Sequence, residues 1–114
     1  MKSLDIVHGN YSLTVSEANV LSGMRRSVLK AKVENNPADD DAVRILRFLT
    51  YPDLISAVVE NSGFEHWPPT FEQFLELPEA LAEKWERAVY ELNPHWRAGE
   101  DEQTPEEKKA STRS

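Results

Sequence analysis

The clearest periodic pattern in the chain is an apolar stripe in its second half. The members of the stripe recur at steps of four, three and four residues, and they are Leu81, Trp85, Ala88 and Leu92. This spacing places their side chains on one face of an amphipathic helix. Pro78 suits the first turn of that helix, and Asn93 suits a left-handed cap at its end. We therefore predict that Trp85 is largely buried.

A shorter helix is predicted just before this one. Thr70 stands three residues before Gln73, which is the spacing of a capping box at a helix N-terminus. The apolar residues Phe71 and Phe74 follow, and the preceding Trp67-Pro68-Pro69 is stiff because proline fixes its φ angle. Residues 67–96 are thus predicted to form a helical hairpin.

The N-terminal third contains two short runs of β type, Leu4–Val7 and Tyr11–Val15. Gly9 and Asn10 lie between them and tolerate positive φ, so a β-hairpin is predicted. Because an isolated two-stranded hairpin is marginal in water, it must pack on the helices or on another subunit.

Ser16 is a favourable N-cap, so a helix is predicted from there to about Val33. Its apolar face consists of Leu21, Met24, Val28 and Ala31. Its basic residues gather toward the C-terminal half, and they are Arg25, Arg26, Lys30 and Lys32. Cations there complement the helix dipole, which is the simpler interpretation. The alternative is a basic docking face for an acidic partner.

Two further helices are predicted in the middle of the chain. The first begins at three aspartates after Pro37, and its predicted buried stripe is Ala42, Ile45, Leu46 and Leu49. Thr50 can cap a second helix, since Pro52 fits a first turn. The apolar residues of this second helix, which is predicted to run to Gly63, are Leu54, Ile55, Val58 and Val59.

After Trp96 the composition changes, because residues 97–114 contain no Val, Ile, Leu, Met or aromatic residue. Such a segment buries too little apolar surface to offset its ordering entropy. We therefore predict a single domain over residues 1–96 and a polar disordered tail over residues 97–114. The predicted fold class is mainly α, with four to five short helices and a small N-terminal β-hairpin.

Composition limits the classes of function. The net charge is −7, and residues 37–96 carry twelve Asp and Glu against four Lys and Arg. An acidic body is a poor nucleic-acid ligand, since such affinity depends on neutralising phosphates. The chain has no cysteine, and no apolar run approaches the ~20 residues of a membrane helix. A soluble protein of the cytoplasm is the expectation.

The sequence offers no pattern typical of catalysis. His8, His66 and His95 are not spaced as metal ligands, and there is no Gly-rich phosphate loop. The aspartates at 39–41 could suggest a metal, but adjacent residues point in different directions around a helix, and the EF-hand spacing is absent. We therefore predict no catalytic residue, no metal and no cofactor, and a binding or assembly protein rather than an enzyme.

Three phrases of the sequence resemble the tail assembly chaperones of long-tailed bacteriophages. They are ILRFLTYPDLISAVVE (Ile45–Glu60), FEHWPPTFEQFLELPEAL (Phe64–Leu81) and KWERAVYELNPHW (Lys84–Trp96), and the similarity runs from about Ile45 to Trp96, roughly half of the chain. The resemblance implies a late viral protein of the host cytoplasm that binds the tape-measure protein and keeps it soluble during viral tail assembly. It also implies a longer frameshifted form that recruits tail-tube subunits.

Two alternatives to this chaperone interpretation remain open. The protein could be a structural subunit of the tail or its connector, or a small acidic regulator of a host nucleic-acid enzyme. A homo-oligomer is also possible for this chain. If a partner is bound, the aromatic residues that flank helix breaks are the predicted anchors, although each could equally fill the core. These partner-binding candidates are Tyr51, Phe64 and Trp67.

Overall fold

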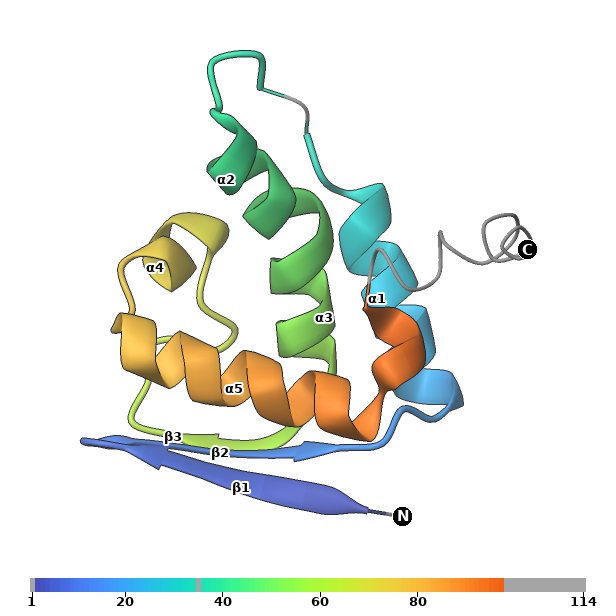
Figure 1. The fold of residues 1–114 in the computed structure, drawn as a ribbon, viewed down its shortest axis with the longest axis vertical. Helices are drawn as coiled ribbons and strands as arrows, with labels where there is room; N and C mark the ends of the chain where they lie inside the picture. The colour runs from blue at the N-terminus through green and yellow to red at the C-terminus, as the bar shows by residue number, and fades with distance from the viewer. Residues whose placement is uncertain (1, 35, 98–114) are drawn as a thin grey trace, which may run out of the picture.

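A three-stranded antiparallel sheet with helices on one face forms the domain (Figure 1). The computed structural model describes residues 2–34 and 36–97. The strand order is β1-β2-β3, and the strands are β1 (Ser3–His8), β2 (Tyr11–Ser16) and β3 (Val58–Ser62). The fold is therefore a small α/β domain, and the prediction of a mainly α fold is wrong.

The third strand is the element that overturns that prediction. The N-terminal hairpin is present as predicted, but the segment expected to be a helix up to Gly63 becomes a strand after Ser56. Val58 lies opposite Val15 of β2, and Ser62 lies opposite Ser12. Val is β-branched and suits a pleated surface, and a third strand stabilises a hairpin that would be marginal alone.

Gly63 ends β3 with a positive φ of 94°. A Cβ atom at this position would lie 2.2 Å from the backbone oxygen of Asn10 in the hairpin turn. Glycine is therefore required here both by the backbone conformation and by the close approach. As a result, the loop after β3 crosses directly against the turn between β1 and β2.

Helix α1 (Val20–Ala31) begins later than the sequence predicted. Ser16 does not cap it, because Ser16 lies at the end of β2, where its N–H donates to the carbonyl oxygen of Ala57 at 3.0 Å. The N-cap is Asn19, which forms a reciprocal capping box with Ser22. The helix is thus one turn shorter at its start than expected.

The predicted restart at Thr50 is also absent, because the backbone stays helical through residues 41–56. This rod consists of α2 (Asp41–Ile45), the π-helical turn η1 (Leu46–Thr50) and α3 (Tyr51–Ser56). The N–H of Tyr51 donates to the carbonyl oxygen of Leu46, five residues back. Proline has no N–H to donate, and the wider π-turn just before Pro52 accommodates this loss within the rod.

The stripe predicted along this rod is only partly correct. Leu46 and Leu49 are half-buried, but Ala42 and Ile45 are exposed. The prediction assumed uninterrupted α-helical periodicity, whereas the π-turn changes the phase of the side chains that precede it. The start of the rod is confirmed, since Asp40 caps it by accepting from the N–H of Val43 at 2.9 Å.

Both helices predicted in residues 67–96 are present. They are α4 (Phe71–Leu75), with the Thr70–Gln73 capping box, and α5 (Glu79–Leu92), followed by the 3₁₀ turn η2 (Pro94–Trp96). The left-handed cap expected at Asn93 is wrong, since its φ is −132°. The side chain of Asn93 instead joins α5 to the end of β2, accepting from the N–H of Ala18 and donating to the carbonyl oxygen of Ser16.

The core lies between the sheet and α5, with α3 and α4 closing it. Trp85 is completely buried, as predicted, and its Nε1 donates to the carbonyl oxygen of Leu54 at 3.1 Å. The other fully buried large apolar side chains are Leu13, Val15, Leu54, Leu81 and Val89. Leu92, the last member of the predicted stripe, is only half-buried.

Within residues 2–34 and 36–97, the helices are all too short or too polar to cross a membrane. The predicted boundary after Trp96 falls at the end of η2, which packs into the core through the Trp96 ring. Residues 98–114, which make up nearly all of the predicted tail, lie outside the described residues.

The burial of Trp85 leads to a first prediction. Trp85→Ala is expected to lower the free energy of unfolding by about 3–5 kcal/mol, because it removes a fully buried aromatic ring and leaves a cavity. Ile45→Ala is the control, since Ile45 is 55% exposed and should change stability by about 0.5 kcal/mol or less. Chemical denaturation followed by circular dichroism measures both variants. Equal stability of the two would contradict the central position of Trp85.

Candidate functional site

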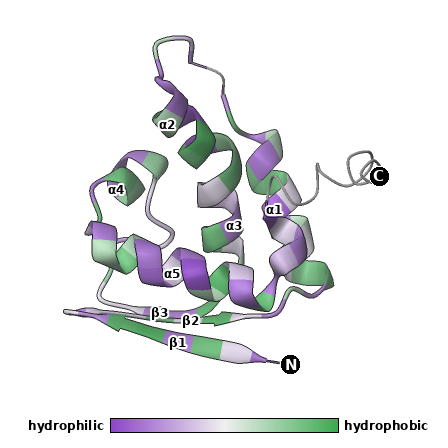
Figure 2. Ribbon diagram, in the orientation of Figure 1, coloured by the Kyte–Doolittle hydropathy of each residue, from purple (hydrophilic) through white to green (hydrophobic). Residues whose placement is uncertain are grey.

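Helix α1 leaves its apolar face exposed. Figure 2 shows hydrophobic and hydrophilic stretches alternating along this helix. The residues that share this exposure are Val20, Leu21, Met24 and Val28, at 88%, 56%, 60% and 43% of their surface. Within α1 itself, only Ser22 is buried. The apolar face predicted from the sequence therefore exists, but the described residues do not cover it. Contiguous exposed apolar surface of this kind is typical of a binding site.

The exposed face continues into a groove between α1 and β3. This hollow of about 510 Å³, named here the α1–β3 groove, is closed on its far side by the loop after β3. Its lining residues are Met24, Arg25, Val28, Leu29, Ile55, Ser56, Val58, Val59, Asn61, Trp67 and Pro68. Most of this lining is apolar, and Arg25 is its one charged residue among those the structure describes. Its shape and lining suit an apolar side-chain stripe on a partner.

A buried polar network fixes the α1 wall of the groove. The Arg26 Nε donates to Asp53 Oδ1 at 2.5 Å, and the Tyr90 hydroxyl donates to Asp53 Oδ2 at 2.6 Å. Asp53 is 1% exposed and belongs to α3, so its carboxylate joins α1 and α5 to α3. The Arg26 guanidinium also stacks over the Trp96 ring at 4.7 Å. Helix α1 is thus attached through a polar contact while its apolar stripe faces outward.

An aromatic cluster fixes the opposite wall. The Trp67 ring stacks on the buried Trp85 ring with centroids 6.3 Å apart, and it meets Phe64 edge-on at 5.1 Å. Phe64 in turn packs against Tyr11 of β2 at 4.9 Å. These contacts hold the half-buried Trp67 side chain in place at the mouth of the groove. Aromatic rings held in this way are the usual energetic centres of binding surfaces.

The three predicted anchors open onto three different hollows. Trp67 lines the α1–β3 groove, whereas Tyr51 lines a smaller hollow beside Arg47 and Phe71. The Tyr51 hydroxyl donates to the carbonyl oxygen of Pro69 at 2.5 Å. Burial, and then the negative charge of Glu72, raise the pKa of Tyr51 above its ordinary value. The Tyr51 ring also packs edge-on against Phe71 and Phe74, so Tyr51 serves as a packing residue in the structure.

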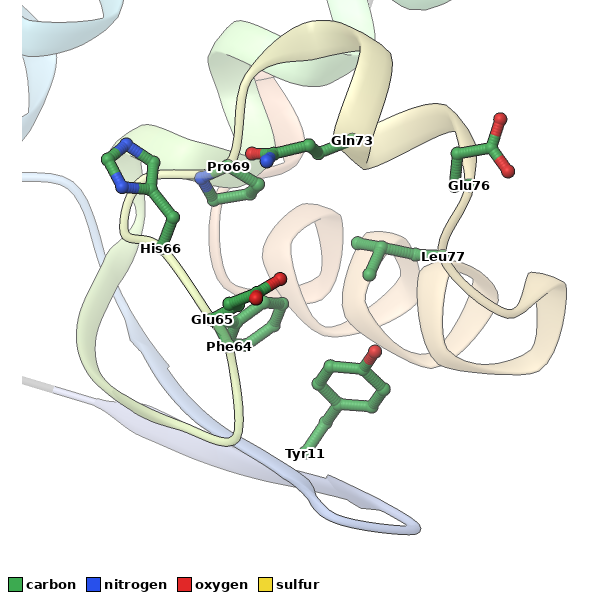
Figure 3. Close-up of a pocket in the computed structure, with 8 residues that line it drawn as sticks. All are labelled: Tyr11, Phe64, Glu65, His66, Pro69, Gln73, Glu76 and Leu77. Atoms are coloured by element: carbon green, nitrogen blue, oxygen red, sulfur yellow. The ribbon is translucent and has the colours of Figure 1, made fainter.

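Phe64, the remaining predicted anchor, lines a pocket of about 210 Å³ between the loop after β3 and α4 (Figure 3). The Tyr11 side chain points across this pocket toward Leu77. His66 and Glu76 lie at opposite ends of the view, so these titratable groups do not converge on one point. Phe64 and Trp67 are thus in ring contact but face different hollows, and Tyr51 is separate from both.

The position of several groove residues is not evident from the sequence. Met24 and Val28 were placed on an apolar face, but the exposure of that face depends on how α1 packs. Val58 and Val59 were assigned to a helix, so their position beside α1 was not foreseen. The adjacent β-branched residues Val58 and Val59 favour a strand, and this signal could have identified β3.

The described residues hold no group of three or more His, Asp or Glu that could bind a metal ion. Asp39, Asp40 and Asp41 diverge, as the sequence indicated. Asp39 pairs with Arg47 at 3.0 Å, Asp41 pairs with Arg44 at 3.0 Å, and Asp40 caps α2. These carboxylates thus have structural partners of their own.

Tyr90 has a strongly perturbed hydroxyl. Burial, the hydrogen bond to Asp53 and the negative charge of that carboxylate raise the pKa of Tyr90 above its ordinary value of 10.0. The charge of Glu86 acts in the same direction, while Arg26 opposes it. The proton of this hydroxyl therefore stays in the Asp53 network at neutral pH.

The polar network leads to a second prediction. Arg26→Ala should lower the free energy of unfolding by about 3–5 kcal/mol, because it leaves the buried carboxylate of Asp53 without its cation. Arg44→Ala is the matched control, since its pair with Asp41 is exposed and should contribute less than about 1 kcal/mol. Urea denaturation measures both. If the two variants lose the same stability, Arg26 does not hold α1 in the way described.

A third prediction concerns alkaline pH. The pKa of Tyr90 is higher in the folded than in the unfolded state, so its contribution to stability is complete below pH 10 and is lost as pH rises through the folded-state value. Absorbance titration at alkaline pH should show Tyr90 and Tyr51 ionising later than tyrosine in the unfolded chain. Tyr90→Phe should remove one late-ionising group. An unchanged titration of that variant would contradict the assignment.

Comparisons with known proteins add no relative to this description. No family model matches the chain, and neither a curated protein nor a solved structure matches it. The resemblance to tail assembly chaperones therefore stays a prediction from three sequence phrases.

Proposed function

We propose that this protein is a non-catalytic tail assembly chaperone of a long-tailed bacteriophage. In this role it binds the tape-measure protein in the host cytoplasm and keeps it soluble until tail-tube subunits assemble around it. The observation that carries the proposal is the outward apolar face of α1, which continues into the α1–β3 groove. The three sequence phrases support the choice of client.

The groove has the features that a reversible chaperone needs. Exposed Met24 and Val28 lie one helical turn apart on α1, and Val59 faces them from β3. A client helix with apolar residues at positions i, i+3, i+4 and i+7 can place its stripe into such a groove. Methionine is flexible and polarizable, so it adapts to several partner sequences along a long client. Binding of this kind protects apolar surface without requiring a chemical step.

The fourth prediction tests this function by coexpression with the tape-measure protein of the same phage. The wild-type protein should keep this client in the soluble fraction. The double variant Met24→Ser and Val28→Ser should lose the effect, because it removes the exposed apolar side chains from the α1 wall. Since both residues are exposed, the variant should keep its fold and its circular dichroism spectrum.

The matched control is the double variant Val7→Ser and Ile45→Ser. These residues are similarly exposed, at 64% and 55%, but lie on β1 and α2, away from the groove. This control should keep the client soluble. A client that precipitates equally with and without the wild-type protein would overturn the chaperone proposal. Equal loss of solubility with both double variants would mean that the groove is not the client site.

A further inference from the structure

The charge on α1 differs in sign from the charge on the rest of the domain. The helix contains Arg25, Arg26 and Lys30 and no Asp or Glu, in a chain with a net charge of −7. Arg26 is neutralised by the buried Asp53. Arg25 has no such role, since it is exposed and lines the α1–β3 groove. The groove thus combines an apolar floor with Arg25 at its rim, and Arg25 forms no ion pair with the residues that the structure describes.

The lining of the groove contains no carboxylate among the residues that the structure describes. The acidic residues of α5 lie on another element, and Glu60 of β3 is outside the lining although its neighbours Val59 and Asn61 belong to it. At physiological ionic strength, charges beyond about 8 Å are largely screened. Among the residues that line the groove, the charge that a bound partner meets is therefore the positive charge of Arg25.

A second copy of this chain does not fit this surface well. Two α1 helices facing each other would bring Arg25 and its copy together, which is unfavourable. The acidic helix α5 cannot serve as the partner, because its apolar residues Leu81, Trp85 and Val89 are fully buried in its own domain. Residues 98–114 contain no large apolar side chain that could fill the groove. These three observations favour a helix from another protein as the occupant.

We infer that the α1–β3 groove binds an acidic amphipathic helix, whose apolar stripe fills the groove and whose Asp or Glu residues flank the stripe beside Arg25. Arg25 is the specificity-determining residue in this arrangement. The inference rests on the proposed function in one respect, namely that such a helix would belong to the client. It adds the charge pattern that the client segment must carry.

The fifth prediction tests the inference with two synthetic peptides and the full-length protein. The peptides have about 18 residues, enough to form a helix, and share one leucine stripe flanked by either glutamate or lysine. Fluorescence anisotropy of labelled peptide measures their affinities. The glutamate peptide is expected to bind about threefold more tightly, the effect of one exposed ion pair. This preference should decrease as the salt concentration rises.

Charge reversal provides the decisive variants. Arg25→Glu should reverse the preference, so that the lysine peptide binds more tightly. Arg87→Glu is the matched control, because it makes the same charge change at an exposed position on α5, outside the groove. This control should leave the preference as in the wild type. If Arg25→Glu does not fold by circular dichroism, Arg25→Ala replaces it and should abolish the preference.

Equal binding of both peptides, or a preference that Arg25→Glu leaves unchanged, would overturn the inference. Dimerisation of the wild-type protein that Met24→Ser abolishes would also overturn it, because a second copy would then cover the groove. A different result would overturn the proposed function, namely a tape-measure protein that stays insoluble when it is coexpressed with the wild-type protein. If the tape-measure protein stays soluble but the two peptides bind equally, only the inference of an acidic partner helix is overturned.

Discussion

The carboxylate of Asp53 is the contact on which the position of α1 depends. It lies almost fully buried at the start of α3, where it receives hydrogen bonds from Arg26 and Tyr90. A buried carboxylate is unfavourable without such partners, so the three side chains stabilise one another. Because these groups come from α1, α3 and α5, the arrangement of the three helices is specified by one polar centre.

Attachment through a polar centre has a consequence for the surface. A helix that packed through its apolar stripe would bury Met24 and Val28, and the groove beside β3 would be filled. In this domain the buried Ser22, Arg26 and the half-buried Leu29 lie on the inward side of α1, so the stripe stays exposed. The Trp67 ring, stacked on Trp85, then faces α1 across the groove. The binding surface thus follows from the way in which α1 is anchored.

Local signals in the sequence were sufficient to predict a feature where neighbouring residues alone determine it. The capping box at Thr70 and Gln73, the turn at Gly9 and the burial of Trp85 were all predicted correctly. The third strand was missed, because Val58 and Val59 also fit a helical stripe and only pairing with β2 decides between the two. The groove was missed for the same reason, since it forms between α1 and that strand. Periodicity also could not reveal that the apolar face of α1 is exposed.

The π-turn between α2 and α3 places one more residue in a turn than an α-helix does. Each residue of an α-helix advances the direction of its side chain by about 100°. The two halves of the rod are therefore out of phase by roughly that angle, as if one residue had been inserted between them. A deletion of one residue in Leu46–Thr50 would turn α2 around the axis of α3 without altering α3 itself. In evolutionary terms, a single codon gained or lost at this point could change which face of α2 meets the solvent.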